Sequence, residues 1–227
     1  MEDKELRLNK FLAERLGLSR RQADDAISNG KVTVDGKLAV LGARIGKNAK
    51  VCYNGKIVPL AVNYTYLALN KPVGYVCSKK RQGDTPTIYE LLPKKYQDLK
   101  TVGRLDKDSS GIILLTNDGD FAFQHTHPKF VKEKQYEVEL NRDLEPLHQQ
   151  EIAEFGIDLS DGKSRLGLAH LDNGRKRWLV TMSEGRNRQI RRTFLAVGYA
   201  VKKLHRIQFG KYRLSELKSG EFVEFRP

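Results

Sequence analysis

The chain has 227 residues, and its 41 Lys and Arg against 28 Asp and Glu give a formal charge of +13. A hydrophobic content of 39% with 30% charged residues fits a globular protein of one or two domains and excludes a disordered chain. Residues 112–115 form the longest strongly apolar run, far short of the roughly 18 residues that a membrane span needs. Residues 1–5 lack the apolar stretch of a signal peptide, and the two cysteines fit a reducing compartment, so we expect a cytoplasmic protein without membrane contact. The charge by itself leaves open whether the protein binds nucleic acid or merely has a basic surface.

The first 60 residues predict a small domain of two helices and a short β unit. Apolar residues recur at helical spacing across residues 6–17, and a capping-box pattern of Ser19 and Gln22 begins a second, shorter helix. Two dipeptides typical of hairpin turns follow, at residues 35–36 and 54–55.

The start of the second helix is a candidate phosphate site. Free backbone N–H groups and the positive end of the helix dipole, together with Ser19, Arg20 and Arg21, would favour a phosphate there. The alternative is a capped helix with two solvated arginines, and the spacing alone does not separate these two interpretations.

Three segments of this region, residues 8–12, 19–23 and 30–36, resemble in their order the alpha-L RNA-binding domain first seen in ribosomal protein S four. The resemblance implies a helix pair packed on a small sheet, with RNA phosphates near the second helix. We therefore expect an RNA-binding domain over residues 1–60 and a linker over residues 61–65.

Residues 66–227 predict a second domain in which short strands outnumber helices. We expect helices at residues 144–155, with Asp143 as the N-cap, and at residues 190–197, and strands at residues 66–69, 74–77, 112–115, 134–140, 178–182 and 201–207. Strands and helices do not alternate regularly, which favours an α+β domain over a doubly wound parallel sheet.

Asp106 is the main candidate for chemistry. It lies in a turn-like segment, residues 103–111, before a buried strand, where an ionised carboxylate can act as nucleophile or base. The alternative is that Asp106 only caps the turn or pairs with Arg104. A calcium loop starting at Asp106 would need a carboxylate where Asn117 stands. The sequence lacks zinc-ligand spacings and glycine-rich phosphate loops, so we expect neither metal nor cofactor.

The stretch from residue 174 to residue 213 carries the densest positive charge. It holds twelve Lys and Arg and a single acid, Glu184, with aromatic residues between them. Basic groups interleaved with aromatic rings suit a phosphate backbone with unstacked bases. The stretch therefore indicates a second RNA-binding surface.

Four ordered segments, residues 69–74, 103–119, 132–138 and 184–192, strongly resemble the RsuA/RluB/RluE/RluF family of ribosomal RNA pseudouridine synthases over essentially the whole chain. This resemblance implies an α+β fold, in which a small N-terminal alpha-L domain precedes a catalytic domain with a mixed, mainly antiparallel β-sheet and flanking helices.

The same resemblance implies roles for individual residues. Asp106 matches the catalytic aspartate, Tyr136 the tyrosine that packs on the target base, and Arg191 the basic residue that pairs with the aspartate. The residues expected to contact RNA are Ser19, Arg20, Arg21, Lys71, Arg104, Arg186, Arg188 and Arg192.

The expected function is site-specific isomerisation of uridine to pseudouridine in ribosomal RNA, by base flipping and a catalytic aspartate. The partner is ribosomal RNA or a precursor of a ribosomal subunit, and we expect a monomer. The alternative is a non-catalytic RNA-binding or ribosome-assembly factor. The sequence leaves open which subunit is modified, and whether Asp106 attacks C1′ or removes a proton at C2′.

Overall fold

A computed structural model describes residues 5–227; residues 1–4, most of the stretch considered for a signal peptide, lie outside that description. The chain forms two compact units. One extends to Thr65 and includes Asn117–Gly119, and the other comprises Tyr66–Thr116 and Asp120–Pro227. The expected linker, residues 61–65, lies at the end of the first unit. In the described part of the chain, no helix has the length and apolar character required to cross a membrane.

The first unit has two helices and a small sheet. Its elements are β1 Leu6–Arg7, α1 Leu8–Leu16, α2 Arg20–Ser28, β2 Val32–Val34, β3 Lys37–Leu38, β4 Arg44–Ile45, β5 Val51–Tyr53 and β6 Lys56–Ile57. The four-stranded sheet has the order β3-β2-β5-β6, and β1 pairs with β4. Helices α1 and α2 contact each other, and their apolar faces form one core with Val32 and Val51.

The first helix begins two residues later than predicted because residues 6 and 7 pair with β4. Both predicted hairpins are confirmed.

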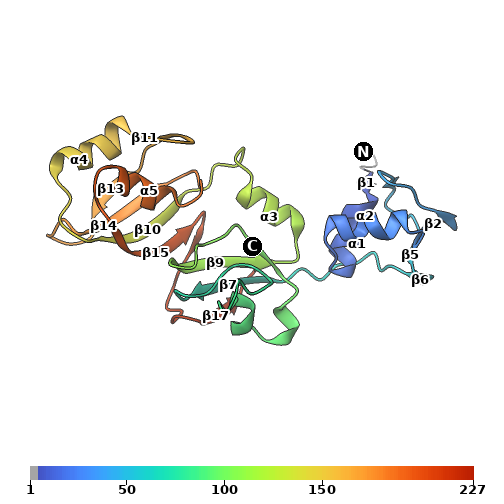
Figure 1. Cartoon of the computed structure of the whole chain (residues 1–227). Coiled ribbons are helices and arrows are strands. Elements are labelled where there is room, and N and C mark those ends of the chain that lie inside the picture. The colour runs from blue at the N-terminus through green and yellow to red at the C-terminus, as the bar shows by residue number, and fades with distance from the viewer. Residues whose placement is uncertain (1–4) are drawn as a thin grey trace. The chain divides into compact units, whose positions relative to one another are not determined.

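The second unit is built on a nine-stranded sheet with the path β13-β14-β10-β15-β9-β7-β17, in which β16 pairs with β15 and β8 with β9 (Figure 1). Its strands are β7 Tyr66–Lys71, β8 Lys100–Val102, β9 Ser110–Thr116, β10 Lys134–Leu140, β13 Gly167–His170, β14 Arg177–Met182, β15 Val201–Phe209, β16 Tyr212–Arg213 and β17 Phe222–Glu224. Strands β15 and β9 are parallel and the other paired strands are antiparallel. The predicted mixed, mainly antiparallel sheet is therefore confirmed.

Helices and one hairpin flank this sheet. They are η1 Ile88–Leu91, η2 Lys94–Tyr96, α3 Gly119–Thr126, α4 Pro146–Gln150, the π-helix η3 Glu151–Phe155, the hairpin strands β11 Ile157–Leu159 and β12 Gly162–Ser164, and α5 Gln189–Ala196. Helix α5 contacts β11 and β15, and its residues Ile190 and Phe194 join the core that contains Trp178 of β14.

Three local predictions were wrong. Residues 74–77 form no strand, because Gly74 has a positive φ of 94° and only Val76 makes a single bridge, to Thr87. The helix expected from residue 144 begins at Pro146 with Glu145 at its N-cap. Helix α3, Gly119–Thr126, is absent from the predicted elements.

Candidate active site

Three adjacent strands bring the Asp106 turn next to Tyr136. Tyr136 of β10 lies opposite Arg206 of β15, and Arg206 lies opposite Gly111 of β9. Asp106 lies in the turn that leads into β9. Gly111 has a φ of +110°, and a Cβ added to it would lie 2.2 Å from the Arg206 carbonyl oxygen. Only glycine fits this contact, so the parallel pairing that joins the turn to β15 depends on it.

Asp106 and Tyr136 line the same cavity, which has a volume of about 600 Å³. Arg104, Arg186 and Arg188 line it as well, while Arg191 is not among its lining residues in the described structure. Tyr136 is buried, and the apolar lining includes Leu105, Val131, Met182, Ile190, Leu204 and Phe209. The cavity therefore combines an apolar wall with the half-buried carboxylate of Asp106, the exposed carboxylate of Glu184 and several cations.

Lys71 supports the Asp106 turn from inside the protein. Its side chain is fully buried, and its Nζ donates to the backbone carbonyls of Ser109, at 2.6 Å, and Pro72, at 2.9 Å. Burial lowers the pKa of Lys71 to about 8, and the nearby charges of Asp106 and Asp108 act in the opposite direction. The prediction that Lys71 contacts RNA is wrong, because RNA cannot reach a fully buried ammonium group.

Asp108, and not Asp106, is the carboxylate that Arg188 and Arg191 contact most closely. Arg188 donates to both of its oxygens at 2.9 Å, and the Arg191 Nε lies 3.3 Å from Asp108 Oδ2. Hydrogen bonds from Arg188 lower the pKa of Asp108. The Asp106 carboxylate has its ion pair with Arg188, at 3.7 Å. The structure thus differs from the expected pair of Asp106 with Arg191. Arg191 forms its ion pair with Asp108, and Arg188 lies closer to Asp108 than to Asp106.

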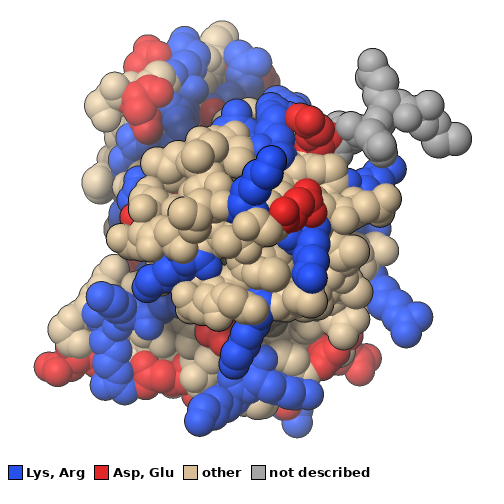
Figure 2. All heavy atoms as spheres, turned by 90° about the vertical axis from the view of Figure 1, so that its right-hand side faces the viewer, with Lys and Arg blue, Asp and Glu red and all other residues tan. Residues whose placement is uncertain are grey.

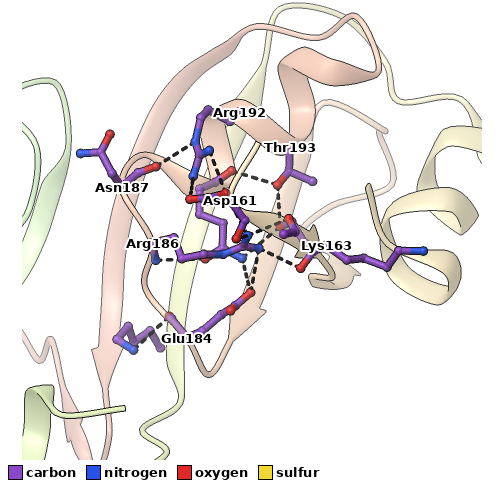
Figure 3. A network of polar contacts seen from close by, with 11 residues as sticks. Asp161, Lys163, Glu184, Arg186, Asn187, Arg192 and Thr193 are labelled. Carbon is purple, nitrogen blue, oxygen red and sulfur yellow. Dashed lines mark hydrogen bonds and ion pairs between the residues drawn. The ribbon is translucent and has the colours of Figure 1, made fainter. Parts of the chain in front are cut away.

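Arg186 and Arg192 hold the β11–β12 hairpin against the start of α5 (Figure 3). Both form ion pairs with Asp161 in the hairpin turn, at 2.9 Å and 2.6 Å. Arg186 also donates to the carbonyl oxygens of Gly162 and Lys163, at 2.7 Å and 2.9 Å. Since their guanidinium groups are bonded to protein oxygens, these two arginines link the hairpin to the start of α5, and their assignment to RNA stays a prediction.

Other predicted RNA contacts remain accessible. Ser19 and Gln22 form the predicted capping box, which leaves the exposed Arg20 and Arg21 at the start of α2. Arg104 is exposed at the cavity. Lys and Arg side chains project over much of the face shown in Figure 2, with fewer acids between them. The exposed side chains of Arg20, Arg21 and Arg104 are therefore suited to contact a polyanion.

Sequence reasoning missed the role of Asp108. The available signal is a second carboxylate two residues after Asp106, a spacing that the calcium-loop pattern also contains. Both carboxylates instead face Arg188. Among residues 5–227, no group of three or more His, Cys, Asp or Glu side chains could hold a metal ion.

Comparison with known proteins gives two family matches. Residues 65–196 match the family described as RNA pseudouridylate synthase, and residues 6–51 match the S4 domain. The chain is 39% identical to the ribosomal small subunit pseudouridine synthase A of Pasteurella multocida, over 96% of this chain and 94% of that protein. It is 34% identical to the ribosomal large subunit pseudouridine synthase B of Bacillus subtilis, over 97% and 92%. A crystal structure of a pseudouridylate synthase, 35% identical, covers 97% of this chain and 96% of its own with a TM-score of 0.69.

Proposed function

This chain belongs to the RNA pseudouridylate synthase family, and on that premise we propose that it converts a specific uridine of ribosomal RNA to pseudouridine in the Asp106 cavity. The observation that carries the proposal is the cavity that Asp106 and Tyr136 share. The relatives compared above are named for either ribosomal subunit, so the modified uridine has to be identified by mapping.

The target base has to leave the RNA stack before it can react. Isomerisation breaks the bond between C1′ and N1, turns the base, and joins C5 to C1′; C5 loses a proton and N1 gains one. A base inside a duplex cannot turn, so the enzyme flips the nucleotide out, at a cost of a few kcal/mol that is lower in looped RNA. The buried ring of Tyr136 then packs against the uracil.

Asp106 acts on the sugar side of the flipped nucleotide. Its carboxylate is either the nucleophile at C1′ or the base at C2′, and in both cases it has to be ionised. Arg188 lies 3.7 Å from this carboxylate and favours its charged form. The reaction is an isomerisation without net redox change or phosphoryl transfer, so the protein's own groups are sufficient for it.

The two units share the binding of RNA. The S4 domain contacts phosphates through Arg20 and Arg21, and Arg104 contacts the backbone at the cavity. The partner is ribosomal RNA, free or within a subunit precursor, and the enzyme acts as a cytoplasmic monomer.

Asp106→Asn tests the proposal. The substitution removes the reactive carboxylate at nearly constant size, so pseudouridine formation on unmodified rRNA transcripts should be abolished while RNA affinity and folding are retained. Pseudouridine mapping in cells with and without the gene identifies the target. Full activity of the variant would refute the role of Asp106, and an unchanged map would favour a non-catalytic RNA-binding factor.

A further inference from the structure

One wall of the cavity takes no part in the chemistry proposed above. It is formed by the end of α3 and the segment that follows, and the lining residues there are His125, Thr126, His127, Pro128, Phe130, Val131 and Lys132. Val131 is 71% exposed, and Phe123 of α3, which precedes His127 by four residues, is 45% exposed. Two large side chains are therefore open to solvent at this wall: Val131, which lines the cavity, and Phe123, which packs against the lining residue Phe130.

The aromatic rings of this wall form a cluster. Phe123 meets Phe130 edge to face, with ring centroids 5.8 Å apart, and its ring centroid lies 4.6 Å from that of His127. The Lys129 ammonium group lies 4.7 Å from the Phe130 centroid and 5.4 Å from the Phe123 centroid. Flat rings with a cation over them are the groups that hold an unstacked base together with its phosphate.

The charge of the segment points to the same kind of ligand. Residues 121–132 contain Lys129 and Lys132 and no Asp or Glu. Lys132 also lines the cavity, as does Arg104. An RNA strand that enters the cavity would thus meet no carboxylate in this segment to repel its phosphates.

We propose that Phe123, His127 and Phe130 form a stacking platform for a nucleotide that flanks the target uridine in the same RNA strand. This inference rests on the proposed function. Flipping the target leaves its neighbour without a stacking partner, and the platform replaces that partner while Lys129 contacts the adjoining phosphate. The platform thereby selects uridines whose neighbour is unpaired.

Kinetics of variants test the platform. Phe130→Leu keeps an apolar side chain but loses the flat ring, and Phe123→Ala removes the second ring. With unmodified rRNA transcripts as substrate, each should raise KM about fivefold or more, the effect of one lost base–aromatic stack, and leave kcat nearly unchanged. Phe130→Trp should restore the KM. Phe155→Ala is the matched control, because Phe155 is 61% exposed and does not line the cavity.

Crosslinking locates the RNA directly. A photoreactive phenylalanine analogue placed at position 130 should crosslink within two nucleotides of the modified uridine, and the same analogue at position 155 should not. Crosslinks far from that uridine, or KM values equal to that of the parent enzyme, would overturn the platform while leaving the proposed function intact. If the parent enzyme forms no pseudouridine, both the proposed function and the platform are wrong.

Discussion

Arg188 donates to both carboxylate oxygens of Asp108, at 2.9 Å each, while the same guanidinium group lies 3.7 Å from the carboxylate of Asp106. A bidentate pair fixes both the distance and the plane of an arginine side chain. Arg188 itself has a left-handed backbone conformation, with a φ of 46°, at the N-cap of α5. Asp108 therefore determines the position of the Arg188 guanidinium group relative to the carboxylate of Asp106.

Asp108→Asn should lower kcat on the order of 10–100-fold, because an amide cannot hold Arg188 by two charged hydrogen bonds and a small misplacement at a reactive group is costly. RNA affinity should stay within about twofold, since most phosphate contacts lie elsewhere. Single-turnover rates and RNA binding measure the two effects separately. Asp108→Glu keeps the charge and should recover part of the rate. If Asp108→Asn had the same kcat as the parent enzyme, the pair of Asp108 with Arg188 would have no role in the reaction.

Much of the site could be predicted from the sequence, since ordered motifs identified Asp106 and Tyr136, and the structure places both in one cavity. The partners of the arginines could not be predicted. Arg188 and Arg191 are one helical turn apart, and the left-handed residue at the start of α5 lets both reach Asp108. Spacing along the chain carries no information about such a local backbone conformation.

The burial of Lys71 and the pairing of distant strands could not be predicted from the sequence either. A lysine in a predicted RNA-binding turn resembles a surface cation, and only the packing of β7 against β9 shows that Lys71 is enclosed. The parallel pairing of β15 with β9 joins residues about 95 positions apart, as His205 and Ser110 are, and no local pattern predicts it. Most local elements, by contrast, followed the predicted periodicities and capping box, apart from residues 74–77, the start of α4 and helix α3.

The low pKa of Lys71, about 8 against an ordinary 10.5, gives a pH-dependent stability. Between these two values the unfolded chain binds more protons at this position than the folded one, so the free energy of unfolding rises with pH across this window. Relative to Lys71→Met, the wild-type protein should gain on the order of 3 kcal/mol from pH 7 to pH 10.5. Urea unfolding of both proteins at several pH values measures the difference. If the free energies of unfolding of the two proteins changed in parallel with pH, the low pKa of Lys71 would be contradicted.

The double substitution of Arg20→Ala and Arg21→Ala tests the S4 domain as an RNA contact. If each arginine neutralises one phosphate, the slope of log affinity against log salt should become shallower by about 1.5. RNA binding at several salt concentrations measures the slope. The double substitution of Arg44→Ala and Lys56→Ala removes the same charge from exposed positions of the same unit and serves as the control. Equal slopes for the two double variants would show that the start of α2 does not contact RNA specifically.

Gly111→Ala should be among the most destabilising substitutions in the second unit. Its Cβ would lie 2.2 Å from the carbonyl oxygen and 2.5 Å from the amide nitrogen of Arg206, and neither backbone atom can move without breaking the β9–β15 pairing. We expect a loss of about 4 kcal/mol or more in unfolding free energy. Gly74→Ala is a matched control, because Gly74 has a similar φ of +94° but open space around its Cβ position, so it should show only the conformational cost of about 1 kcal/mol. Urea denaturation measures both. A small loss in Gly111→Ala would mean that the sheet can separate at this point, and the Asp106 turn would then not depend on β15 for its position beside Tyr136.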